Sequence, residues 1–529
     1  MTLKGLFNVS TIALALSLAG CGGDINVTPT TIDNSTTTTT NTTGSSDSSD
    51  DDTNLCASYE SDGDTLQGAY DSSNDICTYD TSFASASNAI TEDITLSNEV
   101  VHYFKSSLVM GESCDTSQGC SIEVDGPTLT VEAGTTIVFD NSSSRVQINR
   151  GANIEAEGSY DAPITFTSAN TIDALDSVGA GPSPQDWGGI MIDGFGITDQ
   201  CTDAERAAEN CNAESEGAVT YYGGSDNTDD SGTLKFVKIH YAGGLPAGAE
   251  TGNDLNSLSL FAVGSATDID YIDIYAGYDD GIELFGGAVN LKHIVVTDTQ
   301  DDSIDIDAGW QGNAQYLFIK HGTVVNSSGE TIAMGNGGFE SDGEKGDTSA
   351  EAPASAPQIA NVTVITTDDI SVRDSDPSIG IKLDDAISAT WYNTILQKVA
   401  ATQTWCINYS SDAADNIVTN TTAMKTSYAA CAQLAATGNE TVSTDSGSVT
   451  IEGWFTEDGT SVVGNGSDTV LADNGFSTSS ELAITPTDMT TIDADFFETT
   501  DFIGAVSPTD TSSDWYNWVS DAFANADDE

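Results

Sequence analysis

Acidic residues recur at a fixed spacing in the middle of the sequence. The stretch 279–310 contains two aspartate pairs, Asp279-Asp280 and Asp301-Asp302, which lie 22 residues apart. Carboxylates that are brought close together can hold Ca²⁺, and a pair of carboxyl groups can cleave a glycosidic bond by acid/base chemistry. Aspartates can also cap the backbone N–H groups of a turn. The chemistry therefore depends on the elements that position these pairs.

The repeat around the two pairs predicts a solenoid. Residues 279–284 align with residues 301–306, and each segment continues in an alternation of apolar and acidic residues. A second series of strand-like stretches recurs at spacings of 35, 22 and 23 residues, at 234–237, 269–272, 291–294 and 314–317. A period in this range marks a solenoid, and short β-branched runs with no helix between them favour a parallel β-helix. We therefore predict an all-β chain.

Stacking of successive turns of this coil would place matching acidic residues side by side. Alternation points Ile304 and Ile306 into the coil and Asp305 outward. Adjacent strands lie roughly 4.8 Å apart, and at an effective dielectric constant of about 20 each pair of like charges costs about 3 kcal/mol. Something must compensate for this repulsion. The expected neighbours are Glu283 with Asp305, Asp279 with Asp301, and Asp280 with Asp302, with Glu330 extending the Asp280/Asp302 column one turn later.

These columns have three interpretations. In the first, the four aspartates only cap backbone N–H groups of the turn. In the second, they bind calcium, with Asp279, Asp280, Asp301, Asp302 and Glu330 as the candidate ligands. In the third, they act on a polysaccharide, with Asp302, Asp305, Glu283 and Lys320 as the candidate catalytic residues. The basic residues near the acidic turns are Lys292, Lys320 and Arg373, and each can equally serve as a charge partner of the acidic columns.

An aromatic column on the second strand series suggests a different surface. Phe236, Tyr271, His293 and Tyr316 occupy equivalent positions, and alternation points them outward. Such a row can stack on sugar rings or on a partner, or it can pack on itself or under an insertion. Trp310 directly follows the second acidic turn, where it would be either a lid over the turn or a sugar platform.

The net charge restricts the partners of the chain. The 529 residues include 14 basic and 83 acidic side chains, for a net charge of −69. Such a surface repels nucleic acid, so we expect no nucleic-acid partner. Partners bound through charge would be divalent cations or basic groups, although the charge can also serve only solvation in a salty medium.

The N-terminus resembles the signal of a bacterial lipoprotein. Lys4 precedes an apolar run that is too short to span a membrane. Residues 18–21, Leu-Ala-Gly-Cys, resemble a lipobox, which implies removal of residues 1–20 and lipidation of Cys21. Gly22 after the cysteine favours the outer membrane. Residues 21–55, rich in Thr, Ser and Asp, are typical of a disordered tether.

The other eight cysteines fall into four pairs that are local in sequence. An exported protein lies in an oxidising compartment, where disulfides form. Sequence alone leaves the connectivity open, but each pair flanks a stretch that resembles a loop, so local pairing is the simplest expectation. The expected disulfides are Cys56–Cys77, Cys114–Cys120, Cys201–Cys211 and Cys406–Cys431.

Several blocks resemble a family of bacterial cell-envelope proteins with a right-handed parallel β-helix. They are INRGANIEAEGSYDAPITFTSAN, DWGGIMIDGFG, SGTLKFVKIHYAGG, 278–312 and 496–519. The resemblance implies a right-handed coil and carries no activity. The expected organisation is a disulfide-stapled segment at 56–87, a β-helix at 88–400 with loop insertions at 197–230 and 337–356, and an irregular C-terminal part at 401–529 that packs on the helix.

Pectin-cleaving β-helix hydrolases provide a test of the enzymatic interpretation. Those enzymes carry NxD, DD, GHG and RxK motifs; here DD occurs, Lys320-His321-Gly322 is the best substitute for GHG, and RxK does not occur. We therefore expect a non-catalytic outer-membrane lipoprotein that binds a glycan or an envelope protein, or that provides adhesion. The alternatives are a polysaccharide lyase or glycoside hydrolase, with or without calcium, and a purely structural envelope component.

Overall fold

The computed structural model describes residues 54–527, apart from positions 178, 218, 247–253, 345–351, 374–376 and 399–404. The predicted signal peptide, Cys21 and all but the end of the predicted tether lie outside this range, so these remain predictions. Within the described residues, no helix combines the length and apolar character needed to cross a membrane.

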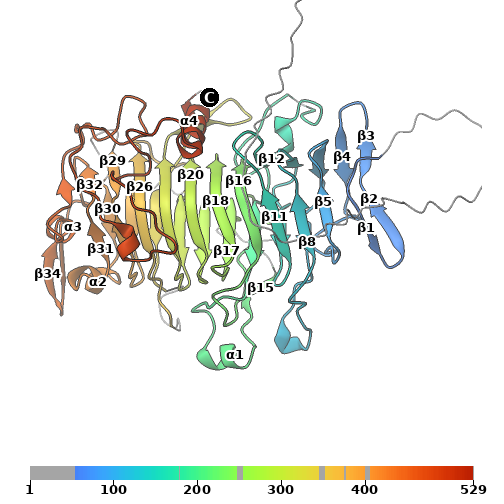
Figure 1. Cartoon of the computed structure of the whole chain (residues 1–529), viewed down its shortest axis with the longest axis horizontal. Helices are drawn as coiled ribbons and strands as arrows, with labels where there is room; N and C mark the ends of the chain where they lie inside the picture. The colour runs from blue at the N-terminus through green and yellow to red at the C-terminus, as the bar shows by residue number, and fades with distance from the viewer. Residues whose placement is uncertain are drawn as a thin grey trace, which may run out of the picture. The chain divides into compact units, whose positions relative to one another are not determined.

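One wall of the coil is a nine-stranded parallel sheet (Figure 1). Each strand is three to five residues long, and each except the two end strands pairs with the strand one turn earlier and the strand one turn later. In sheet order these strands are β7 (Leu108–Met110), β10 (Val146–Ile148), β13 (Ile190–Asp193), β17 (Leu258–Phe261), β19 (Ile282–Phe285), β21 (Ile304–Asp307), β25 (Gly337–Ser341), β27 (Ile379–Leu383) and β30 (Ile407–Tyr409).

Long bent strands form the other walls. In β18, Tyr271 has a φ of +54°, so the strand turns a corner there, and the register to β20 continues with Ile272 opposite Ile294. Toward both ends of the coil, two separate strands replace each bent strand. The bent strands are β16 (Gly232–His240), β18 (Asp268–Tyr275), β20 (Asn290–Thr297), β22 (Asn313–Lys320) and β26 (Gln358–Thr366). The separate strands are β4 (Ile76–Tyr79), β5 (Ile94–Leu96), β6 (Val101–Phe104), β8 (Thr128–Val131), β9 (Thr136–Phe139), β11 (Asn153–Glu157), β12 (Ile164–Ser168), β28 (Thr390–Tyr392), β29 (Ile395–Lys398), β31 (Ala423–Lys425), β32 (Tyr428–Ala430) and β35 (Val462–Val463).

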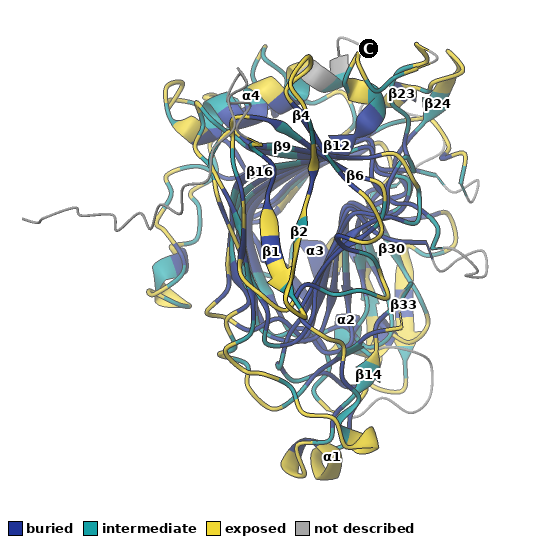
Figure 2. Cartoon of the chain, turned by 90° about the vertical axis from the view of Figure 1, so that its right-hand side faces the viewer, coloured by how far each residue is buried: buried dark blue, intermediate teal, exposed yellow. Residues whose placement is uncertain are grey.

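The core lies inside the coil, as the alternation predicts. Ile282, Leu284, Ile304 and Ile306 are each 1% exposed or less and belong to one continuous apolar cluster. Figure 2, which looks along the coil, shows buried strands in the walls and exposed residues mainly in the loops. A slip of one residue would turn these side chains to solvent, so burial sets the register. The predicted all-β parallel β-helix is confirmed.

The coil extends further than the sequence indicated. At the N-terminal end, β4 pairs in parallel with β6, so the stapled segment contributes strands to the coil. At the C-terminal end, β32 pairs in parallel with β35, so part of 401–529 is regular coil. The predicted loop at 337–356 also begins too early, because β25 is a strand of the nine-stranded sheet.

Smaller elements leave the coil as hairpins and short helices. The insertion at 197–230 packs its Tyr222 against Phe261 and Phe285 of the nine-stranded sheet.

All four predicted disulfides are present. The hairpins and other short strands are β1 (Ser58–Ser61) with β2 (Asp64–Gln67), β3 (Ala69–Asp71), β14 (Ala213–Glu214) with β15 (Tyr221–Tyr222), β23 (Thr323–Val325) with β24 (Thr331–Ala333), and β33 (Thr441–Thr444) with β34 (Gly447–Thr450). The helices are α1 (Asp203–Ala207), α2 (Ala414–Val418), α3 (Ile451–Phe455), α4 (Asp514–Asp527) and the 3₁₀ turns at Thr116–Gln118, Ala169–Thr171 and Met489–Thr491.

Candidate functional site

A row of acidic side chains, here called the acidic ladder, crosses the outer face of the nine-stranded sheet. Glu283 of β19 lies opposite Asp305 of β21, and Asp305 lies opposite Glu340 of β25. Lys382 of β27 follows one turn later, beside Glu340. The apolar neighbours of these residues point into the coil, so the pleat of the sheet turns the acidic ladder outward.

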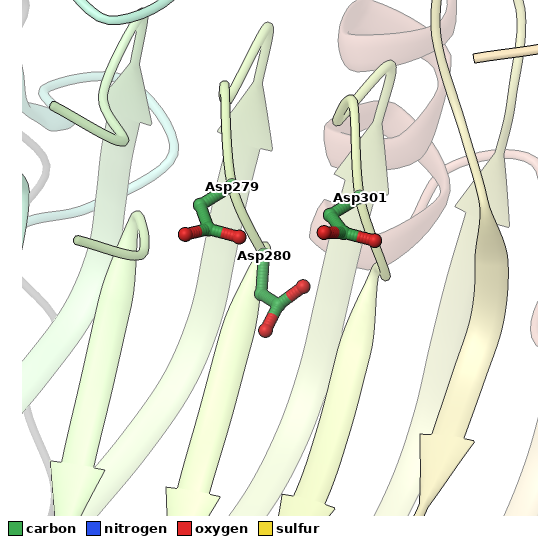
Figure 3. Close-up of side chains that lie close together, drawn as sticks. All are labelled: Asp279, Asp280 and Asp301. Atoms are coloured by element: carbon green, nitrogen blue, oxygen red, sulfur yellow. The ribbon is translucent and has the colours of Figure 1, made fainter. Parts of the chain in front are cut away.

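The aspartate pairs lie in the turns that lead into β19 and β21. The Oδ1 atom of Asp280 accepts a hydrogen bond of 2.9 Å from the backbone N–H of Asp302, so the predicted capping role is confirmed for this residue. Figure 3 shows Asp279 and Asp301 at equivalent places on adjacent turns, with Asp280 next to the start of its strand. One carboxylate oxygen from each of these three residues lies within 4.8 Å of the other two.

A second group of carboxylates shares Asp280 with the first. Oxygen atoms of Asp280, Glu283 and Asp305 also lie within 4.8 Å of one another. Asp280 and Glu283 are 8% and 6% exposed, and Asp305 is half-buried. The five residues Asp279, Asp280, Glu283, Asp301 and Asp305 are called the acidic cluster below.

Arg373 neutralises one side of the acidic cluster. Its guanidinium contacts Asp279, lies 3.3 Å from an Oδ2 atom of Asp301 and also pairs with Asp254. The prediction that Arg373 is a charge partner of the acidic columns is therefore confirmed. The guanidinium of an arginine carries several N–H donors, so Arg373 can contact carboxylates on several turns of the coil at once.

Lys382 of β27 neutralises Asp302, which lies in the turn before β21. The Nζ atom of Lys382 lies 3.0 Å from Asp302 Oδ2 and 3.9 Å from Glu340 Oε1, and Asp302 is 1% exposed. Burial opposes ionisation of Asp302, but Lys382 and hydrogen bonds outweigh it and hold the pKa of Asp302 below its usual value. Asp302 is therefore a buried partner of Lys382 and is inaccessible as a catalytic nucleophile.

Burial and neighbouring carboxylates raise the pKa of several other acidic groups at this place. In the described part of the chain, no ion pair joins Asp280 or Asp305 to a basic side chain, and burial and neighbouring carboxylates raise the pKa of both well above the usual value. Burial raises the pKa of Asp279 to about 8 despite Arg373. The charge of Asp302, together with burial, raises the pKa of Glu340 to about 10. The Oδ1 atom of Asp305 has no hydrogen-bond partner among the described residues. When these carboxyls ionise, no basic side chain among the described residues compensates the charge of Asp280 or Asp305.

The acidic ladder leads into a hollow of about 380 Å³, here called the Glu340 hollow. Glu340, Lys382 and Asn408 line it, together with the half-buried aromatic residues Trp405 and Tyr409. Aromatic faces beside polar groups are what a sugar-binding site requires. None of these five residues is among the sites predicted from the sequence. The repeat carries a signal for Glu340, because residues 338–342 align with residues 303–307, whereas the predicted loop at 337–356 includes this stretch.

Two predicted site residues lie elsewhere. Glu330 is exposed near the tip of the β23–β24 hairpin and does not continue the Asp280/Asp302 column, because β25 supplies the next turn. The ammonium group of Lys320 lies 4.8 Å from the ring centre of Phe523 in α4, rather than among the carboxylates. His321, next to it, is buried between Ser303 and Ser378, and burial lowers its pKa to about 4.

The prediction for Trp310 was wrong. Its side chain is 0% exposed, lies in the main core and donates a hydrogen bond of 3.0 Å to the carbonyl oxygen of Val289. It is neither a lid nor a sugar platform, because the chain turns inward after the acidic turn.

Replacing Trp310 with alanine is therefore expected to lower the free energy of unfolding by about 3–5 kcal/mol, as for other large buried aromatics. Denaturant unfolding measures this change. Trp405→Ala, at a half-buried aromatic, is the matched control and should cost less. Equal costs for the two variants would contradict the assignment of Trp310 to the core.

The aromatic column is also not an open platform. Phe236, Tyr271, His293 and Tyr316 stack on one another with ring centres 4.1–4.9 Å apart. Each sits at a corner with a positive φ of 51–64°, which turns the side chain outward. The C-terminal helix α4 covers the column through Trp515 and Trp518, not the 197–230 insertion as one interpretation had it. The aromatic column therefore forms the surface of the coil on which α4 packs.

Comparison with known proteins agrees with this geometry. Residues 90–476 match the model of the pectate-lyase-like β-helix domain. The chain belongs to this family. The search of curated proteins and the search of solved structures gave no match. The pectate-lyase-like β-helix supports a carbohydrate-related role in general terms.

Proposed function

We propose that this pectate-lyase-like β-helix is a non-catalytic, calcium-dependent glycan-binding lipoprotein of the bacterial outer membrane. The observation that supports this most directly is the outward-facing group Asp280, Glu283 and Asp305, which begins the acidic ladder that ends in the aromatic Glu340 hollow. A cation at this group and a sugar in the hollow would share one continuous face of the sheet.

The donor set suits calcium. Ca²⁺ takes six to eight oxygen ligands and tolerates irregular geometry. The acidic cluster offers carboxylate oxygens from five residues, Arg373 compensates only its Asp279/Asp301 side, and the Oδ1 atom of Asp305 has no partner among the described residues. Asp302, an earlier candidate ligand, is instead the partner of Lys382. Calcium would provide the missing positive charge and a contact for sugar hydroxyl or carboxylate oxygens.

The lipid anchor and the tether remain part of this proposal. The lipobox-like sequence that ends at Cys21 would fix the chain to the membrane. Residues 24–55 of this tether would reach up to roughly 100 Å if fully extended. This length would hold the coil clear of the membrane, where its outer face could meet a polysaccharide or an envelope protein. The membrane and such a ligand are therefore the expected partners.

Calorimetry tests the proposal. We expect Ca²⁺ to bind the purified protein, and a panel of acidic and neutral polysaccharides to include one whose binding is lost in EDTA. The double variant Asp280→Asn/Asp305→Asn should weaken calcium binding by at least about tenfold, because it removes two charged ligands. Glu330→Gln, an exposed carboxylate outside the acidic cluster, is the control. No heat with Ca²⁺, or equal binding by the double variant, would reject the calcium site.

A second candidate function is cleavage of a glycosidic bond. It is favoured by Glu340, whose side chain is 35% exposed in the hollow and whose raised pKa, about 10, keeps the proton that a general acid must donate. Lys382 is a poor lyase base: burial lowers its pKa, but the charge of Asp302 outweighs this effect and keeps the ammonium group protonated. Release of reducing ends that Glu340→Gln abolishes would replace the binding function with this one.

A further inference from the structure

A second hollow lies at the N-terminal end of the same sheet and shares no residue with the acidic cluster. It has a volume of about 1080 Å³, and Val109 of β7, Gln147 of β10 and Ser215 of the 197–230 insertion are among its lining residues. It is called the Arg145 hollow here, after the side chain that distinguishes it. Its volume is at the upper end of the range for sites that bind small ligands.

Arg145 lines this hollow and uses only one of its side-chain nitrogens in a hydrogen bond to the described residues. The residue is 8% exposed, and its Nε–H donates a hydrogen bond of 3.0 Å to Gln147 Oε1. Within the described ranges, the two terminal nitrogens have no hydrogen-bond partner, and no carboxylate forms an ion pair with the guanidinium. Arg150 provides the contrast, because its terminal nitrogens donate to the carbonyl oxygens of Cys114, Cys211 and Gly223. Arg150 therefore has a structural role, whereas the donors of Arg145 point to a ligand.

A hydrogen-bond chain holds the guanidinium in place. Gln147 accepts from Arg145 and donates to Asp193 at 3.0 Å, and Ser215 donates to the other oxygen of Asp193 at 2.7 Å. Burial raises the pKa of Asp193 to about 7, so this carboxyl only partly offsets the positive charge. The arrangement orients Arg145 through a neutral amide instead of pairing it directly with a carboxylate. Such preorganisation lowers the cost of binding.

The rest of the lining suits a polar anion. Nine serine and threonine side chains line the hollow, and Lys105 adds a second positive charge beside a single carboxylate, Glu112. A chain with 14 basic and 83 acidic residues has few cations to place in one hollow. Hydroxyl groups can both donate to and accept from a ligand, and a guanidinium binds two oxygens of a carboxylate or phosphate at once.

We propose that the Arg145 hollow is a binding site for a hydroxyl-rich ligand that carries an oxyanion, a carboxylate or a phosphate, held by the terminal nitrogens of Arg145. The oxyanion accepts from the two terminal nitrogens, Lys105 adds charge at the rim, and the serine and threonine hydroxyls bind the rest of the ligand. The site requires no divalent cation, which separates it from the acidic cluster.

Titration calorimetry with four probes, in EDTA and at low salt, tests the site: glucose, glucose 6-phosphate, glucuronate and inorganic phosphate. We expect glucose 6-phosphate, glucuronate or both to bind, glucose not to bind, and inorganic phosphate to compete. Arg145→Gln should weaken binding by roughly tenfold or more, because it removes a charged donor pair. The preferred oxyanion follows from which of the two anionic sugars binds more tightly.

Lys425→Gln makes the same change of charge outside the hollow and should leave the affinity unchanged. Arg145→Lys keeps the charge without the fork and should fall between wild type and Arg145→Gln. Melting temperatures confirm that each variant is folded, and the Asp280→Asn/Asp305→Asn variant should bind the anionic probes normally. Binding of none of the anionic probes, or equal binding by Arg145→Gln, would overturn the proposal and leave the calcium-dependent function untouched.

Discussion

Lys382→Met is expected to lower the free energy of unfolding by about 3–5 kcal/mol at pH 7, because it leaves a buried charge without its partner. The carboxylate at stake is Asp302, which is 1% exposed and 3.0 Å from the ammonium group. Methionine keeps most of the length of the lysine side chain, so the loss reflects charge more than volume. Denaturant unfolding measures it.

The matched control removes both charges. In the double variant Lys382→Met/Asp302→Asn, the buried carboxylate is gone, and most of the lost stability should return. The cost of Lys382→Met alone should also shrink at pH 5, since Asp302 can then take up a proton. If Asp302→Asn brought no recovery, the ion pair would not be the source of the effect.

Without divalent cations, the stability of the protein is expected to fall as the pH rises from about 5 to about 9. Asp279, Asp280, Asp305 and Glu340 have folded-state pKa values above those of the unfolded chain, chiefly because of burial and neighbouring carboxylates. Raised pKa values of acids contribute stability that is complete below the unfolded value and is lost as the pH passes through the folded value. For Asp279 this window runs from about 4 to about 8.

The size of the effect follows from the number of protons involved. A tenfold difference in acidity corresponds to about 1.4 kcal/mol, so several such groups should together lower the free energy of unfolding by at least about 3 kcal/mol across this range. Carboxyls with lowered pKa values, such as Asp302, act only at acidic pH and leave the window unchanged. Unfolding experiments in EDTA at several pH values measure the slope.

Calcium should reverse this loss if the proposed site is correct. Binding requires ionised carboxylates, so calcium affinity should increase with pH and binding should release protons. In the Asp280→Asn/Asp305→Asn variant, both the fall in stability with pH and its rescue by Ca²⁺ should be smaller. A flat profile in the wild-type protein would show that the acidic cluster does not hold protons as described.

The neighbours of the acidic residues could be predicted because a solenoid converts sequence spacing into distance. The offset of 22 residues places Asp305 beside Glu283, and the structure has this register. The same reasoning failed at Glu330, where the β23–β24 hairpin interrupts the regular period and delays the next turn to β25. Local periodicity predicts a register only as long as no insertion breaks it.

By itself, the sequence determined the coil, its inward-facing residues and the local disulfides, because alternation, period and short loops act over a few residues or one turn. Only the tertiary structure decided which charges are compensated and which surfaces remain open. Arg373 and Lys382 reach aspartates far away in the chain, and α4 returns to cover the aromatic column. These contacts depend on how distant segments pack, which no local pattern records. Trp310 is a further example: the sequence predicted it at the edge of the acidic turn, but the backbone turns inward there and places its side chain in the core.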